Sequence, residues 1–142
     1  MNFKTEDFLV KQGSKLKLKE LDTSFSAGIN KKKGRKKLIK NIEELADFQE
    51  KFWADNRYSL LIILQAPDAA GKDGAIRHVM SGVNPQSCRV HCYKVPSKEE
   101  LDHDYLWRHY KDLPERGMIE IFNRSHYEPV LATKVNPQYL LA

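Results

Sequence analysis

The segment with the clearest chemistry is QAPDAAGKDG, residues 65–74. Its small residues would let backbone N–H groups approach an anion closely, and Lys72 adds a positive charge. The small residues are Ala69, Ala70, Gly71 and Gly74. An apolar run precedes the segment and a helix-like pattern follows it, so the positive end of a helix would face the bound anion. The pattern predicts a phosphate-binding loop. The alternative is a tight strand-to-helix turn that uses small residues for packing.

Several residues of this segment depart from the usual phosphate-binding pattern. Ala66 stands where a first glycine is expected, and Asp73 stands where a Ser or Thr hydroxyl normally binds Mg²⁺. Pro67 removes one backbone N–H and favours an extended Ala66. Asp68 would repel a phosphate unless it holds Mg²⁺ or orients an attacking phosphate oxygen. We expect Asp73 to bind metal differently or to point away.

A second polar group occurs in IFNRSHYE, at the end of a predicted strand. Residues that support Mg²⁺ or phosphate commonly sit at the end of a strand that neighbours the loop, and Asn123 occupies that position. The guanidinium of Arg124 has a planar fork that suits phosphate, although a surface charge at a strand end is the alternative. Glu128 is near enough in sequence to add a carboxylate. Arg77 and His78 are weaker candidates, one turn into the helix after the loop.

Hydrophobic spacing predicts the elements that position these residues. We expect helices over residues 5–12, 36–54 and 74–83, and a longer helix within residues 97–117 that opens with a Ser97–Glu100 capping box. Residues 58–66, 87–95 and 118–123 are predicted strands. The run YSLLIILQA is nearly continuous in apolar residues, which is typical of a strand buried on both faces. This alternation predicts an α/β fold with a parallel sheet flanked by helices. Three strands make a thin sheet, so we expect a partial domain.

The positive charge of the chain is concentrated near its N-terminus. Residues 1–40 contain twelve Lys or Arg and four Asp or Glu, whereas residues 41–142 contain twelve and fifteen. The block INKKKGRKKLIKN carries most of the excess and can attract nucleic acid, anionic lipid or an inorganic phosphate chain. A solvated arm is the alternative. Aromatic residues are not interleaved with this block, which makes nucleic acid the less favoured partner.

Cysteine content and hydropathy restrict the cellular setting. Cys88 and Cys92 would lie on one face of a strand about 13 Å apart, too far for a disulfide. His91 would point to the opposite face, so two buried thiols are expected in preference to a metal site. No apolar run approaches the roughly 20 residues of a membrane span, and the first twenty residues lack a signal-peptide core. We expect a cytoplasmic protein without membrane contact.

Three ordered stretches resemble the polyphosphate kinase type 2 family: DAAGKDGAIRHVMSGVNPQ, PSKEELDHDYLWRHYKDLPERG and IFNRSHYE. The resemblance runs from about Gly28 to the C-terminus. It implies a P-loop kinase fold and Mg²⁺-dependent phosphoryl transfer between inorganic polyphosphate and a purine nucleotide. Family members continue into a helical lid, which agrees with a partial domain. The implied division is a basic arm over residues 1–35 and a truncated P-loop kinase domain over residues 36–142.

The resemblance also assigns roles by position. Asp68 and Lys72 match a functional pair in the loop, Asn123 and Arg124 match a strand-end pair, and Glu128 matches an acidic position after it. The combination of Ala66, Asp73 and Asn123 resembles the branch that accepts nucleoside mono- and diphosphates, whereas Pro67 fits the family less well. We therefore expect catalysis by Asp68, Lys72 and Arg124, and Mg²⁺ binding by Asp68 and Glu128. We expect nucleotide or phosphate binding by Ala69, Ala70, Gly71, Lys72, Asp73, Gly74, Asn123 and Arg124.

Two alternatives to this activity stay open at the level of sequence. One is a nucleotide kinase that uses ATP as its phosphoryl donor. The other is a binding module that holds nucleotide or polyphosphate without transferring a phosphoryl group. The residues do not distinguish the preferred nucleotide or the direction of reaction. The oligomeric state also stays open, and a homo-oligomer is one alternative.

Overall fold

The computed structural model describes residues 4–140 and divides the chain into two compact units, Met1–Ile39 and Lys40–Ala142. The boundary falls four residues beyond the one expected between arm and domain. The strands and all the α-helices that follow them along the chain lie in the second unit. Among the residues that the structure describes, no helix combines the length and apolar character that crossing a membrane requires.

The first unit is mostly irregular, with two short 3₁₀ helices at Thr5–Phe8 and Leu18–Glu20. The predicted helix over residues 5–12 is therefore only one short turn. The long helix α1 (Lys31–Asp55) begins in this unit and continues into the second. Its start is marked by Asn30, whose side-chain oxygen accepts a hydrogen bond from the backbone N–H of Lys33 at 2.9 Å. The basic block is therefore helical from Lys31 onward, five residues before the predicted start.

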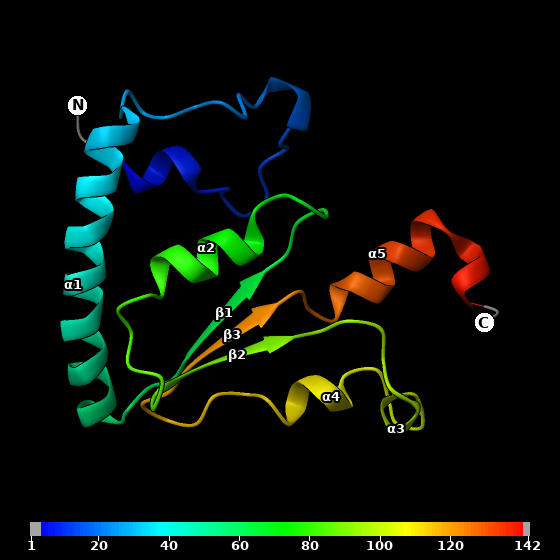
Figure 1. Ribbon diagram of the computed structural model, residues 1–142. Helices are drawn as coiled ribbons and strands as arrows, with labels where there is room; N and C mark the ends of the chain where they lie inside the picture. The colour runs from blue at the N-terminus through cyan, green and yellow to red at the C-terminus, as the bar shows by residue number, and fades with distance from the viewer. Residues whose placement is uncertain (1–3, 141–142) are drawn as a thin grey trace. The chain divides into compact units, whose positions relative to one another are not determined.

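The second unit contains a three-stranded parallel sheet (Figure 1). Strands β1 (Leu60–Leu64), β2 (Cys88–Cys92) and β3 (Ile119–Asn123) are arranged in the order β1-β3-β2. Leu64 and Cys92 are both in register with Asn123. The three strands therefore end level, and the residues after them meet at one edge of the sheet. This confirms the predicted parallel α/β sheet.

The core is centred on β3, which is buried at all five positions. Ile119 and Ile121 face one side of this strand, and Glu120 and Phe122 face the other. The prediction that the apolar run at residues 58–66 is buried on both faces is wrong for the described residues. Leu60 and Ile63 are 39% and 44% exposed, because the strand order places β1 at the side of the sheet and the less apolar β3 at its centre.

Helices lie on both sides of the sheet (Figure 1). Helix α2 (Lys72–Val79) is on the side of Asn123, whose amide contacts Asp73. Helix α4 (Trp107–Tyr110) is on the other side, where the ring of His109 lies 5.9 Å from that of Phe122. Helix α5 (Tyr127–Val135) follows the carboxyl end of β3. The sequence pattern did not reveal this helix.

The predicted helix within residues 97–117 is replaced by two short ones, α3 (Lys98–Leu101) and α4. The Ser97–Glu100 capping box is confirmed at the start of α3. Asp104 interrupts the helical pattern because its carboxylate accepts a hydrogen bond from the backbone N–H of Leu106 at 3.0 Å. Such local side-chain bonds compete with helix formation. The apolar spacing therefore predicted neither a continuous helix nor a buried face, since Tyr110 and Leu113 are 63% and 47% exposed.

Gln49 joins α1 to the segment before β2 within the second unit. Its buried amide donates to the carbonyl oxygen of Asn84 at 2.8 Å and to the hydroxyl of Ser87 at 2.7 Å. Its side-chain oxygen accepts from the backbone N–H of Asn84 at 2.7 Å. Gly82 lies against the same helix, where an added Cβ would be 2.4 Å from Ile42 Cγ2. These contacts fix the connection that leads from α2 back to the sheet.

Candidate functional site

The segment between β1 and α2, residues 65–71, lies at the carboxyl edge of the sheet. Gly71 is the N-cap of α2 with a φ of 93°, a left-handed conformation that favours glycine. Ala69 has a φ of 61°, which is uncommon for a residue with a Cβ. Helix α2 begins at Lys72 and not at Gly74 as predicted, so the N–H groups of Lys72, Asp73 and Gly74 lack partners inside the helix.

Lys72 turns its ammonium group back over the loop. The group donates hydrogen bonds to the carbonyl oxygens of Ala66 at 2.6 Å and Pro67 at 2.9 Å. Pro67 therefore has a local role, since its carbonyl helps to hold the lysine although its nitrogen has no hydrogen to donate. An ammonium group has three N–H donors, so this arrangement leaves capacity for another oxygen at the same edge.

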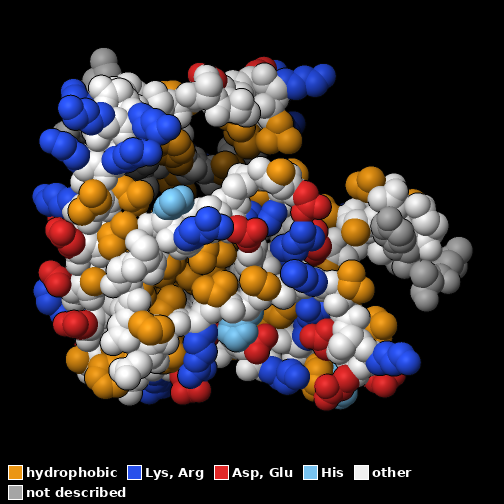
Figure 2. Space-filling view, in the orientation of Figure 1, with side chains coloured by type: hydrophobic (Ala, Val, Ile, Leu, Met, Phe, Trp, Pro, Cys, Tyr) orange, Lys and Arg blue, Asp and Glu red, His pale blue; other side chains and the backbone are white. Residues whose placement is uncertain are grey.

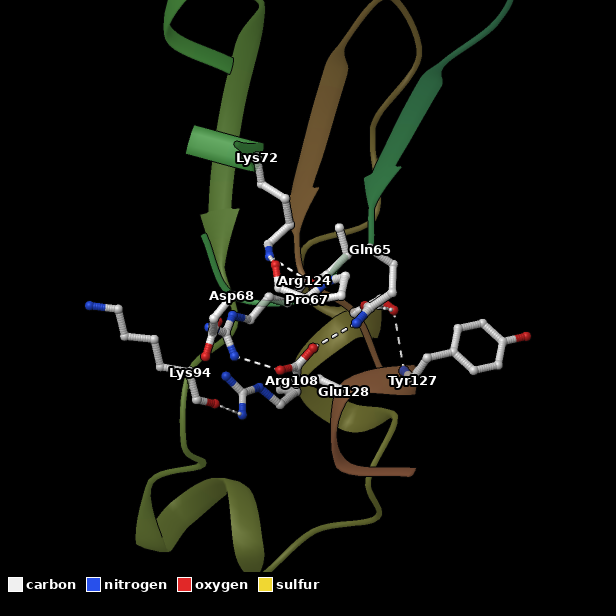
Figure 3. A network of polar contacts seen from close by, with 11 residues as sticks. Gln65, Pro67, Asp68, Lys72, Lys94, Arg108, Arg124, Tyr127 and Glu128 are labelled. Atoms are coloured by element: carbon white, nitrogen blue, oxygen red, sulfur yellow. Dashed lines mark hydrogen bonds and ion pairs between the residues drawn. The ribbon is translucent and has the colours of Figure 1, made fainter. Parts of the chain in front are cut away.

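Arg124 is at the centre of a cluster of charged side chains, the Arg124 cluster (Asp68, Arg124 and Glu128; Figure 3). Its Nη2 donates to Asp68 Oδ1, and its Nη1 donates to Glu128 Oε1. The side chain of Asp68 is 83% exposed, whereas those of Arg124 and Glu128 are about one-third exposed. Residues predicted from two distant motifs thus meet here. Asp68 comes from the loop, Arg124 from the end of β3 and Glu128 from α5.

Two residues that the sequence did not single out complete this arrangement. The amide of Gln65 donates to Glu128 Oε2 at 2.6 Å, and its oxygen accepts from the hydroxyl of Ser125 at 3.0 Å (Figure 3). The same hydroxyl accepts a hydrogen bond from the backbone N–H of Tyr127 at 3.2 Å. The available signal was position alone, since Gln65 and Ser125 are polar residues just beyond the ends of β1 and β3.

Asn123 and Asp73 are direct partners. The Asn123 amide donates to Asp73 Oδ1 at 2.6 Å, across the junction of β3 and α2. Asn123 is buried, and Cys92 Sγ lies 3.7 Å from the same amide nitrogen. Asp73 Oδ1 therefore faces the end of the central strand. The pair connects the loop helix to the central strand.

The other sequence candidates lie apart from these contacts. Arg77 and His78 are exposed on α2, in the last turn of the helix. Ala69, Ala70 and Gly71 are exposed in the loop, and Gly74 is half-buried in the first turn of α2. The two cysteines are free thiols, with Cys88 half-buried and Cys92 exposed. The expectation that both thiols are buried is therefore wrong, because β2 is a side strand of the sheet.

The balance of charge bears on a metal ion at this edge. The side chains of the loop and the strand end comprise two cations, Lys72 and Arg124, and three carboxylates, Asp68, Asp73 and Glu128. A phosphate chain would add further negative charge, which a divalent cation offsets. The exposed Asp68 fits Mg²⁺, which binds one or two carboxylates together with phosphate oxygens and water. Glu128 fits less well, because both of its oxygens already accept hydrogen bonds. In the described part of the chain, no three His, Cys, Asp or Glu side chains form a ready-made metal site.

An open groove of about 510 Å³ adjoins the loop. Gln65, Ala66, Pro67 and Glu128 line the end next to the Arg124 cluster. The far side is formed by α5 and the residue after it, through Leu131, Ala132, Val135 and Asn136. The groove is thus continuous with the polar site and becomes more apolar along α5.

The opposite face of the sheet carries a polar network that the sequence did not reveal. Glu120 is only 1% exposed, and one of its oxygens lies 2.7 Å from Nε2 of His91. Nδ1 of His91 lies 3.3 Å from Asp112, which also accepts a hydrogen bond from the Tyr93 hydroxyl at 2.8 Å. Burial and this hydrogen bond raise the pKa of Tyr93 well above its usual value. Each buried polar group in this network has a partner, which indicates a structural role behind the site.

The parallel sheet, the helices on both sides and the polar residues at the carboxyl edge define a layered α/β domain. The model of the polyphosphate kinase 2 (PPK2) family matches residues 28–138. A solved structure described as polyphosphate kinase 2 from Arthrobacter aurescens TC1 is similar with a TM-score of 0.82 and 37% identity. The similarity covers 91% of this chain and 47% of that one. The chain belongs to the polyphosphate kinase 2 family.

Comparison with curated relatives shows how much of a longer family member this chain matches. An ADP-polyphosphate phosphotransferase of Rhodopseudomonas palustris is 48% identical over 99% of this chain and 49% of the relative. An AMP/ADP-polyphosphate phosphotransferase of Meiothermus ruber is 50% identical over 64% of this chain and 34% of the relative. The chain therefore spans about half the length of the first of these relatives and matches a third of the second.

Proposed function

We propose that this chain carries the phosphate-binding half of a polyphosphate:nucleotide phosphotransferase. The terminal phosphoryl group of polyphosphate would pass to an oxygen of the terminal phosphate of a nucleotide. One P–O–P bond breaks and another forms, and the leaving group is a polyphosphate one unit shorter. The reverse transfer uses the same groups. The observation that carries the proposal is the contact between Asp68 of the loop and Arg124 of the strand end, which joins two motifs 56 residues apart.

The roles that we propose for individual residues follow from their placement. The N–H groups of residues 69–74 and the positive end of α2 bind phosphate oxygens. Lys72, whose ammonium group donates to the carbonyl oxygens of Ala66 and Pro67, adds positive charge where the phosphates would bind. Arg124 neutralises charge on the group in transfer. Catalysis of this kind consists mainly of positioning and electrostatic stabilisation.

Mg²⁺ is part of the proposal, and Asp68 is its first protein ligand. Glu128 would be a second ligand only on losing its hydrogen bond from Gln65 or from Arg124. When bound, the ion would offset the negative charge of the phosphates. The groove along α5 offers space beside the loop for the acceptor nucleotide. A purine nucleotide and inorganic polyphosphate are the proposed partners. The relatives named for ADP and for AMP/ADP support this class of acceptor without fixing which one is used. The cytoplasmic location stays a prediction.

The test is a transfer assay with the purified chain, polyphosphate, Mg²⁺ and either ADP or AMP. We expect ATP or ADP to form, and Lys72→Met to reduce the rate roughly 100-fold or more, because one positioned cation is removed from the transition state. Lys134→Met is the matched control, since Lys134 is an exposed lysine on α5. Equal rates for Lys72→Met and the unaltered chain would overturn the assignment of the loop.

A binding module without transfer is the second candidate, favoured by the ion pairs that already hold Arg124 on Asp68 and Glu128. It predicts that polyphosphate or nucleotide binds with Lys72-dependent affinity and that no product forms. Calorimetric titration alongside the transfer assay separates the two. Replacing polyphosphate by ATP as the donor tests the third alternative, an ATP-dependent nucleotide kinase.

A further inference from the structure

Arg124 has an unusual backbone for a residue of its type. Its φ is 73°, in the left-handed region that residues with a Cβ rarely adopt. Such conformations persist where the surroundings over-determine them, and they concentrate at functional sites. The backbone N–H of Arg124 donates to the carbonyl oxygen of Leu64 at 3.0 Å, which fixes the chain at the end of β3. That bond fixes the backbone but leaves the long side chain to be positioned by other groups.

The direct partners of the guanidinium are weak anchors when considered alone. Asp68 is largely exposed, and Glu128 is an i,i+4 partner that is one-third exposed. Exposed ion pairs of this kind contribute little, because solvent screens them and both side chains lose freedom. A third group is needed if Arg124 is to be held in one orientation.

Gln65 supplies that third group. Its NH₂ donates to Glu128 Oε2 at 2.6 Å, on the carboxylate oxygen that Arg124 does not use. A carboxylate accepts but cannot donate, so the NH₂ end of the amide must face Glu128 and its oxygen must face Ser125. Ser125 is 1% exposed, and its hydroxyl donates to that oxygen at 3.0 Å. The orientation of Gln65 is therefore set by chemistry at both ends.

We propose that Gln65 is a positioning residue that, with Ser125 behind it, orients Arg124 through Glu128 for phosphoryl transfer. Buried Ser125 accepts a hydrogen bond from the backbone N–H of Tyr127, at the start of α5, which ties this arrangement to the end of β3. Gln65 does not touch the phosphates. The inference rests on the proposed function for its kinetic consequence, but the orientation of Arg124 is a property of the protein alone.

The first experiment measures the Arg124 side chain directly by NMR, which suits a chain of 16.5 kDa. Restricted rotation separates the guanidinium N–H signals, and free rotation merges them. We expect separate Arg124 signals in the unaltered chain and merged signals in Gln65→Met, which keeps the length of the side chain and removes both hydrogen bonds. Gln86→Met is the matched control, because Gln86 is an exposed glutamine on the segment before β2. Unchanged Arg124 signals in Gln65→Met would overturn the proposal.

The second experiment measures transfer kinetics. We expect Gln65→Met to lower kcat roughly 10- to 100-fold, with a much smaller change in KM for polyphosphate, because the arginine is misplaced and not removed. Ser125→Cys keeps nearly the same volume with a weaker donor and should act in the same direction, less strongly. Ser125→Cys tests the proposal in place of Gln65→Met if that variant folds poorly. A kcat unchanged in both variants, or lowered equally in Gln86→Met, contradicts the proposal. If the unaltered chain transfers no phosphoryl group, the proposed function fails, whereas the NMR comparison still decides the role of Gln65.

Discussion

At the level of single residues, the two unusual positions flanking the site explain each other. Asp73 replaces the hydroxyl residue that follows the lysine in most phosphate-binding loops, and Asn123 stands at the end of the central strand. The amide of Asn123 donates to Asp73 at 2.6 Å. An amide can donate to a carboxylate, whereas a second carboxylate in its place would face a like charge. The two residue types are therefore linked by their contact.

This contact predicts a reciprocal effect on stability. Asn123→Asp should lower the free energy of unfolding by roughly 1–3 kcal/mol, because two carboxylates would then meet at a partly buried contact. Adding Asp73→Asn should recover much of the loss, since the new amide can donate to the new carboxylate. Urea denaturation of both single variants and the double variant measures the coupling. A double variant no more stable than Asn123→Asp alone would show that the contact does not control these residues.

The residues of the site differ in how well the sequence predicted them. Asp68, Lys72, Asp73, Asn123, Arg124 and Glu128 were all candidates because charged or amide groups followed recognisable loop and strand patterns. Their grouping was also expected, since parallel strands end at one edge of a sheet. Their pairing was not, because Asp68, Asp73 and Glu128 are all carboxylates that could accept a hydrogen bond from Arg124, and only the fold selects Asp68 and Glu128. Gln65 and Ser125 carried no pattern of their own.

At the level of elements, α4 covers the face of the sheet behind the site. His109 on this short helix is buried, with its ring 4.1 Å from the ring of Tyr93 and 5.9 Å from that of Phe122. Burial lowers the pKa of His109, and the nearby charges of Arg108 and His126 lower it further. Nδ1 of the ring is buried without a hydrogen-bond partner among the described residues. The imidazole of His109 is therefore harder to protonate in the folded protein than in the unfolded chain.

Acidification should consequently destabilise the second unit. The unfolded chain protonates this histidine near its ordinary pKa of about 6.5, at a higher pH than the folded protein does. The stabilising contribution is complete above pH 6.5 and is lost as the pH falls through the lowered pKa of the folded state. His109→Phe should weaken this pH dependence while keeping the aromatic packing. Thermal unfolding between pH 7.5 and 5 measures it, with His103→Phe as the exposed control; an equal pH dependence in both variants argues against His109 as the cause.

The elements themselves were predicted with uneven success. The three strands and the helix after the loop were expected from apolar runs of the right length, and each is present near its predicted position. Helix α5 was missed because its apolar residues do not gather on one face and Pro129 lies inside it. The single helix expected within residues 97–117 is broken because Asp104 forms a local turn. A hydrogen bond between a side chain and the backbone broke this helix, and the spacing of apolar residues does not predict such bonds.

At the level of the whole molecule, charge is divided along the chain. The excess of positive charge lies in residues 1–40, and the structure shows that Lys31 and the basic residues after it form the first turns of α1. No acidic residue occupies the first turn of this helix. Cations near a helix N-terminus are unfavourable in the field of the helix, so an anion at this place would relieve the repulsion. Polyphosphate is the anion that the proposed function supplies.

We predict that Lys32→Gln with Lys36→Gln weakens polyphosphate binding roughly 2–5-fold at about 0.1 M salt, with the effect disappearing near 1 M. The matched control is Lys15→Gln with Lys19→Gln, which changes the net charge equally and has the same spacing in the same unit. Titration calorimetry at several salt concentrations gives both affinities. If both pairs weaken polyphosphate binding equally, the net charge of the protein alone attracts polyphosphate. If Lys32→Gln with Lys36→Gln does not weaken binding, the basic block is not a binding surface.

The local pattern of the sequence was sufficient to establish the class of fold, the order of the elements around the loop and the identity of most charged residues at the candidate site. These properties follow from local spacing, since alternating apolar runs specify strands and helices, and small residues before a lysine specify a loop. Tertiary structure decided which strand is central, which carboxylates Arg124 contacts and which neutral residues orient them. Those outcomes depend on contacts between segments 50 or more residues apart, such as Gln65 with Glu128 and Asp73 with Asn123. Local patterns carry no information on such pairings until the sheet brings the strand ends together.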